Sequence, residues 1–211
     1  SIDKINKPKR IIPLGLLNKK HAFLLTSILY AIGIWACFLL CPLGKHIALL
    51  IVFPLLIAYS LILKHIQLIG NFIIGGITGS VFIFSEAALT NEINKMWIPF
   101  CLATCLSIIR EICKDVEDVE GDLRCNIITF PARHGSYSTL LLLRIFSICF
   151  CLFALLPWLY DYYGMLYLVL LLFFIELPLL YGVFVMIKKK SKIKEFIYLS
   201  TLLKGITIMG I

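Results

Sequence analysis

Long apolar stretches alternate with short polar segments along most of the chain. Seven stretches approach or exceed the roughly 20 residues that a helix needs to cross a bilayer. They are too long and too uniformly apolar for barrel strands, and backbone groups in lipid must pair within the segment, so helices are expected. The pattern predicts an all-α fold, a polytopic membrane helical bundle. The predicted transmembrane helices are 22–42, 45–63, 67–89, 96–114, 139–160, 163–187 and 195–211.

The composition supports a membrane protein with a single domain. Hydrophobic residues make up 61% of the 211 residues and charged residues only 15%, and the mean hydropathy is +0.98. No Gly/Ser linker, internal repeat or low-complexity tract divides residues 1–211. The opening from Ser1 to Pro13 has no initiator Met and reads like the middle of a loop. We therefore expect the chain to be a fragment.

Basic residues gather on one side of the predicted membrane. If the spans alternate in direction, that side carries Lys4, Lys7, Lys9, Arg10, Lys19, Lys20, Lys64, Arg110, Lys114, Arg124, Arg133 and the five lysines of 188–194. The opposite loops carry only Lys45 and Lys95. The positive-inside rule makes the basic side cytoplasmic, in the inner (cell) membrane. The net charge of +8 then indicates attraction to membrane lipids, and no nucleic-acid partner is expected.

The most informative polar feature is a run of carboxylates that ends the fourth apolar stretch. On a helix, spacings of three and four residues turn Asp115, Asp118 and Asp122 to one face. Glu111 extends the same stripe by one turn. Such a stripe repels itself unless cations neutralise it.

Other polar residues within the spans have simpler interpretations. Glu176 and Lys204 lie in the sixth and seventh spans, and pairing with each other is expected because adjacent spans are antiparallel. Glu86 is expected near the outer interface. Cys101 and Cys105 are one helical turn apart, but no histidine is near them in sequence. The cysteines are therefore interpreted as small packing residues, and no zinc site is assigned.

The aspartate segment carries a family resemblance. Residues 110–122, Arg-Glu-Ile-Cys-Lys-Asp-Val-Glu-Asp-Val-Glu-Gly-Asp, with Thr-Phe-Pro-Ala-Arg-His-Gly at 129–135, resemble the second aspartate-rich motif of the UbiA-type intramembrane prenyltransferases. The opening segment from Asp3 to Arg10 resembles the tail of that family's first motif, of which only Asp3 is present. The family has nine helices, so the resemblance implies that this UbiA-type domain lacks its first two helices and most of the first motif.

Two further positions fit the resemblance. Tyr59 and Lys64 occupy the place of a Tyr and a Lys near the cytoplasmic end of the family's fourth helix, although they are five residues apart rather than four. Asn71 follows Gly70 where family members often have an Asn.

The family's chemistry explains these residue types. A prenyl diphosphate ionises to an allylic cation, and divalent ions that bridge carboxylates and phosphate oxygens neutralise the departing charge. The resemblance implies Mg²⁺, bound by Asp3, Asp115, Asp118 and Asp122. It implies diphosphate binding by Arg10, Lys64, Asn71, Arg110 and Lys114. The implied catalytic set is Tyr59, Lys64, Asp118 and Asp122.

Simpler roles stay open for several of these residues. The alternative interpretation of Lys64 and Arg110 is that they are cations that snorkel at helix ends. For Tyr59 the alternative is an interfacial aromatic residue. Asn71 is equally placed to satisfy backbone groups between helices. Arg10 lies in a loop whose basic residues set membrane sidedness.

The acceptor substrate is indicated only by resemblance to one subgroup of the family. Residues 114–122, with the Tyr59 region, most resemble the subgroup that transfers geranylgeranyl to geranylgeranylglyceryl phosphate in ether-lipid biosynthesis. An aromatic acceptor of quinone biosynthesis, 4-hydroxybenzoate or naphthoate, is the alternative. A cation transporter would show Gly/Pro-broken spans in both halves, and a structural membrane subunit would need no aspartate stripe. We expect residues 1–211 alone to be inactive or nearly so, and the oligomeric state is unknown.

Overall fold

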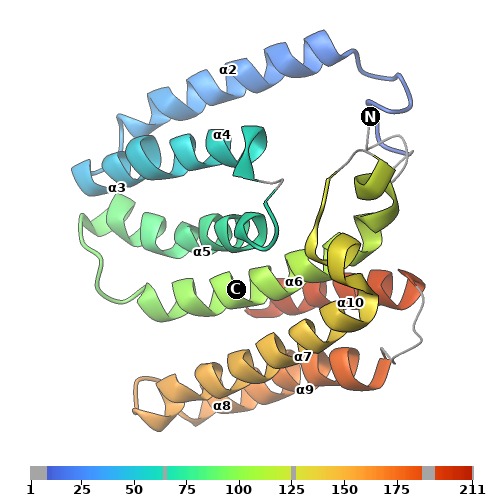
Figure 1. Ribbon diagram of the computed structural model, residues 1–211. Helices are drawn as coiled ribbons and strands as arrows, with labels where there is room; N and C mark the ends of the chain where they lie inside the picture. The colour runs from blue at the N-terminus through green and yellow to red at the C-terminus, as the bar shows by residue number, and fades with distance from the viewer. Residues whose placement is uncertain (1–8, 64–65, 125–126, 187–192, 211) are drawn as a thin grey trace.

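The computed structural model describes residues 9–63, 66–124, 127–186 and 193–210, and these ranges are built from helices and short connections (Figure 1). The α-helices are α2 (Lys19–Cys37), α3 (Pro42–His46), α4 (Phe53–Leu61), α5 (Ile69–Thr90), α6 (Trp97–Arg124), α7 (Phe130–Leu159), α8 (Met165–Leu170), α9 (Leu177–Leu180) and α10 (Ile193–Gly210). Three π-helical turns are η1 (Ile47–Val52), η3 (Leu171–Glu176) and η4 (Tyr181–Met186). They join α3 to α4 and α8 to α9, and extend α9.

The helices correspond to the apolar stretches of the sequence, so the all-α prediction is confirmed. Within the described ranges, five segments are long and apolar enough to cross a membrane: Lys19–Cys37, Pro42–Leu61, Ile69–Thr90, Phe130–Leu159 and Met165–Met186. The fourth and seventh predicted spans, in α6 and α10, are not among these five. In α6, three charged residues fall within the first 18 positions. The count of seven spans stays a prediction.

Local sequence signals set several helix ends. Asn18 caps α2, because its side-chain oxygen accepts a hydrogen bond from the backbone N–H of Lys20 at 3.1 Å. Pro131 occupies the first turn of α7, where its missing N–H costs nothing. Gly135 interrupts α7 with a φ of 78°, a conformation that glycine adopts without steric cost. The chain therefore bends between the start of α7 and its long apolar part.

Helices α5 and α6 pack closely because α5 presents glycines to its neighbour. A Cβ atom on Gly75 would lie 2.6 Å from Cγ1 of Ile108, and one on Gly79 would lie 2.6 Å from the Phe100 carbonyl oxygen. Neither position leaves room for a side chain. The two backbones consequently approach each other in one register.

The main apolar core lies between α6, α7, α10 and the α8–η4 segment. Its fully buried side chains include Ile109, Ile112, Leu143, Leu179, Leu199 and Leu203. Helix α2 differs, since Cys37 is its only buried residue and the helix lies at the edge of the bundle in Figure 1. The C-terminal half of the bundle thus has a dense core, whereas α2 offers its apolar surface to its surroundings.

The structure contradicts the expected pairing of Glu176 with Lys204. Glu176 is buried, and within the described ranges its Oε1 has no hydrogen-bond partner. Lys204 is exposed. Because α10 turns Leu199 and Leu203 into the core, Lys204 points to a different side of that helix. The pairing prediction, made from span order alone, is wrong.

Candidate active site at the end of helix α6

Helix α6 continues through the whole aspartate run to Arg124. The expected helical phase of Asp115, Asp118 and Asp122 is therefore present in the structure. Asp122 is buried at 8% exposure, and Asp115 and Asp118 are partly buried. In Figure 1 this end of α6 lies at the same end of the bundle as the end of α4 and the start of α5.

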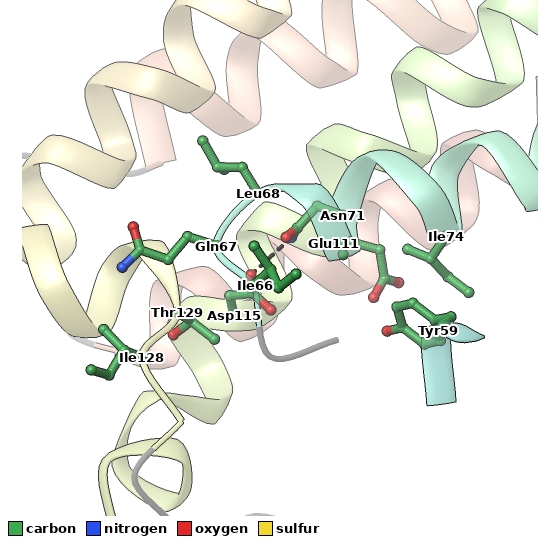
Figure 2. Close-up of a pocket in the computed structure, with 11 residues that line it drawn as sticks. Tyr59, Ile66, Gln67, Leu68, Asn71, Ile74, Glu111, Asp115, Ile128 and Thr129 are labelled. Atoms are coloured by element: carbon green, nitrogen blue, oxygen red, sulfur yellow. Dashed lines mark hydrogen bonds between the residues drawn. The ribbon is translucent and has the colours of Figure 1, made fainter. Parts of the chain in front are cut away.

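A narrow cavity opens beside Asp115. Its volume is about 30 Å³, roughly enough for one water molecule. Helix α4 contributes Tyr59, α5 contributes Asn71, and α6 contributes Glu111 and Asp115 (Figure 2). The remaining lining residues are Ile66, Gln67, Leu68, Gly70, Ile74, Ile128 and Thr129. Segments far apart in the sequence therefore meet at one polar point.

Asn71 and Asp115 form the direct link between α5 and α6 at this cavity. The Asn71 Nδ2 donates a hydrogen bond of 2.8 Å to Oδ2 of Asp115 (Figure 2). Burial raises the pKa of the Asp115 carboxyl to about 7, and the negative charges of Glu111 and Asp122 add to the rise. The bond from Asn71 acts in the opposite direction, because it favours the ionised form. Asp115 is therefore an acid that exchanges its proton near neutral pH.

Glu111 binds both neighbouring cations. Its Oε1 lies 2.7 Å from Nη1 of Arg110, and its Oε2 lies 2.8 Å from Nζ of Lys114. The Glu111 side chain is only 11% exposed, whereas those of Arg110 and Lys114 are 28% and 34% exposed. One buried carboxylate thus lies beneath two more accessible cations.

The structure brings together only part of the predicted site. Tyr59, Asn71 and Asp115 line one cavity. Arg10 lies in an exposed turn before α2, and none of the cavities described here includes it. Asp3 and Lys64 fall outside the described residues. Asp118 and Asp122 follow on α6, beyond Asp115.

Sequence reasoning gave no role to several residues of this cavity. The sequence pattern places Glu111 in the acidic stripe, and its position next to Arg110 and three before Lys114 is the signal for the ion pairs that the structure contains. Gln67 and Thr129 also line the cavity, and the sequence carries no comparable signal for them.

The donors of this region suit a hard cation. Within the described ranges, no three His, Cys, Asp or Glu side chains stand together closely enough to hold a metal ion. Mg²⁺ usually takes one or two protein carboxylates and completes its shell with water and substrate phosphates. Asp115 offers a carboxylate beside an open cavity, with two more carboxylates on the same helix face. The residues therefore fit Mg²⁺ when a phosphate-bearing substrate supplies the other oxygens.

A larger apolar cavity lies nearer the other end of α6. Its volume is about 230 Å³. The lining residues are Phe82, Pro99, Leu102, Ala103, Leu106, Tyr163, Tyr167, Leu171, Ile175 and Thr207. This lining suits a hydrocarbon group rather than a charged one.

Comparisons with known proteins agree with the aspartate motif. Residues 1–202 match the UbiA prenyltransferase family. The digeranylgeranylglyceryl phosphate synthase of Natronomonas pharaonis is 34% identical over 170 residues, which cover 81% of this chain and 61% of that protein. The synthase of the same name from Methanococcus maripaludis strain C7 is 34% identical over 198 residues, or 90% of this chain and 67% of that protein. The chain thus spans about three fifths to two thirds of these relatives.

A solved structure is also similar to this chain. It is described as "Structural and mechanistic insights into the biosynthesis of Digeranylgeranylglyceryl phosphate synthase in membranes". The two chains are 29% identical and superpose with a TM-score of 0.73 over 99% of this chain and 73% of that one. The resemblance drawn from the sequence is confirmed. Because the described part of the chain contains five segments apolar enough to span a bilayer, the chain is an integral membrane protein, and it belongs to the UbiA prenyltransferase family.

Proposed function

We propose that the protein is a Mg²⁺-dependent intramembrane prenyltransferase of ether-lipid biosynthesis. It transfers a geranylgeranyl group from its diphosphate to geranylgeranylglyceryl phosphate. The observation that carries the proposal is the end of α6, where Asp115 accepts a hydrogen bond of 2.8 Å from Asn71 and Glu111, which lines the same cavity, holds Arg110 and Lys114. The names of these two relatives support this acceptor over the aromatic acceptors of quinone biosynthesis.

On α6, basic residues would bind the diphosphate and acidic residues would bind the metal. Arg110 and Lys114 offer N–H donors to the diphosphate oxygens and hold fixed positive charge where the leaving group becomes more negative. Asp115, Asp118 and Asp122 would hold Mg²⁺. When bound, Mg²⁺ neutralises charge on the departing diphosphate.

The covalent step is a substitution at C1 of the geranylgeranyl group. The bond from C1 to the diphosphate oxygen breaks, and the electron pair leaves with diphosphate. A glycerol hydroxyl oxygen of the acceptor forms the new ether bond to C1, and its proton passes to the departing diphosphate. The apolar helices around the site exclude water, which would otherwise capture the allylic cation.

Membrane placement follows from the charge pattern. We place the end of α6 on the cytoplasmic side of the cell membrane, since the basic segments of the chain gather on this side. In this placement the seven predicted spans cross the bilayer as part of a nine-helix fold.

The experiment that tests the function compares acceptors. The full-length protein in lipid vesicles receives geranylgeranyl diphosphate, Mg²⁺ and either geranylgeranylglyceryl phosphate or 4-hydroxybenzoate. The proposal expects an ether-linked product with the first acceptor and little product with the second. Preferential prenylation of hydroxybenzoate would select the quinone alternative, and no transfer to either would refute the proposed function.

A further inference from the structure

We propose that Glu111 is a positioning residue that assembles Arg110 and Lys114 into an anion site before the substrate arrives. The inference rests on the proposed function and names a residue that its chemistry does not otherwise use. It begins from the two ion pairs that share one carboxylate, at 2.7 and 2.8 Å.

The side chains of Glu111, Arg110 and Lys114 differ in their exposure to solvent. The Glu111 side chain is 11% exposed, about one third of the exposure of Lys114 at 34%. Arg110 has an intermediate value of 28%. The carboxylate therefore anchors both cations from the protein side and leaves their other faces accessible.

Both cations keep hydrogen-bonding capacity for a ligand. A guanidinium has five N–H donors and an ammonium has three. Glu111 accepts one hydrogen bond from each group, so the remaining N–H donors can reach phosphate oxygens without breaking the ion pairs. A diphosphate presents several such oxygens, and charge-assisted bonds to them are among the stronger polar contacts in proteins.

Preassembly matters because both side chains are long and flexible. Fixing a Lys or Arg rotamer upon binding costs affinity. Two neighbouring cations also repel each other, and a carboxylate shared between them offsets that repulsion. Glu111 makes both contributions before the ligand binds, at a position that also lines the cavity of Asp115.

A competing role for Glu111 predicts the opposite result. If its carboxylate only competed with diphosphate for the cations, loss of its charge would strengthen diphosphate binding. If it positions the cations, the same loss weakens binding. The sign of the change therefore separates the two roles.

The same helix supplies a matched control. Glu120 pairs with Arg124 at 2.7 Å, but these side chains are 65% and 61% exposed. Such a surface pair contributes little to stability or geometry. Glu120→Gln removes the same charge from α6 without touching the buried cluster.

The test measures inorganic pyrophosphate binding and steady-state kinetics in full-length wild-type protein, Glu111→Gln and Glu120→Gln. Glu111→Gln is expected to weaken pyrophosphate binding and to raise the KM for geranylgeranyl diphosphate, each about tenfold. The KM for the acceptor should change by less than about threefold, because the lost positioning acts on the diphosphate and not on the acceptor. Glu120→Gln should match the wild type in every measurement.

Circular dichroism and melting curves establish that each variant is folded. Should Glu111→Gln fail to fold, Glu111→Asp replaces it, since this variant keeps the charge but withdraws it by one methylene. It is expected to show a smaller loss in the same direction. Unchanged or tighter pyrophosphate binding by the folded variant, or an equal loss in Glu120→Gln, would overturn the inference. A wild-type protein that neither binds pyrophosphate nor transfers the prenyl group would instead refute the proposed function.

Discussion

The contact between α5 and α6 makes Gly79 a sensitive position. In Gly79→Ala the new Cβ would overlap Oγ1 of Thr104 and lie 2.6 Å from the Phe100 carbonyl oxygen. The Thr104 hydroxyl can turn away, but the backbone oxygen of Phe100 can move only with α6. The substitution must therefore push the two helices apart.

The loss of stability in Gly79→Ala follows from the distance between the new Cβ and the Phe100 carbonyl oxygen. Ordinary contact begins near 3.4 Å, so the helices must separate by roughly 0.8 Å at this point. Overpacking of this kind costs about 1–3 kcal/mol. Alanine has the higher helix propensity, which offsets up to about 1 kcal/mol.

Gly76 provides the control for helix propensity, because a Cβ at Gly76 would meet no heavy atom within 4 Å. We expect Gly79→Ala to be less stable than Gly76→Ala by about 1–3 kcal/mol. Reversible denaturation of both variants in the same detergent measures this difference. The KM for Mg²⁺ should rise in Gly79→Ala alone, since Asn71 lies two turns away on α5 and reaches Asp115. Equal stability of the two variants would refute the account of the α5–α6 contact.

Three further outcomes are expected. The Mg²⁺ concentration for half-maximal activity should fall as pH rises through about 7, because Asp115 with its raised pKa is protonated below that pH and the metal must displace the proton. In Asn71→Leu this pH dependence should move to higher pH, because the hydrogen bond that lowers the pKa of Asp115 is lost. A Mg²⁺ requirement that does not change with pH would contradict the assignment of Asp115 as a metal ligand. A chelator should abolish prenyl transfer and added Mg²⁺ or Mn²⁺ should restore it, whereas activity that survives chelation would exclude a divalent-ion mechanism. Glu86→Ala should lower the melting temperature, because the Glu86 carboxylate accepts backbone hydrogen bonds from Asn94, Lys95 and Met96 in the loop before α6. The KM values for geranylgeranyl diphosphate and for the acceptor should not change.

The helices could be predicted from the sequence because apolar length is a strong signal in membrane proteins. Their ends could not be located as well. Helix α6 extends to Arg124, beyond the predicted span that ends at 114, as the placement of the aspartates on one helix face requires. Helix α7 begins at Phe130 rather than 139, with the bend at Gly135 inside it. Hydropathy locates the lipid-facing part of a helix and is silent about its polar continuation.

The composition of the site could be predicted further than its contacts. The three- and four-residue spacing placed the aspartates on one helix face, because helical phase is a local property. The bond between Asn71 and Asp115 joins residues 44 positions apart and depends on how α5 and α6 pack. The mistaken pairing of Glu176 with Lys204 has the same origin, since the rotation of α10 about its axis is set by tertiary packing.

Prenyl transfer by Asp118→Ala and Asp122→Ala in the full-length protein tests the central claim most directly. The account predicts that each variant loses activity by about 100-fold or more, because these carboxylates act on charge that grows in the transition state. Circular dichroism and melting curves should show that both variants stay folded. Turnover at the wild-type rate by either folded variant would contradict the assignment of the α6 aspartate face as the catalytic metal site.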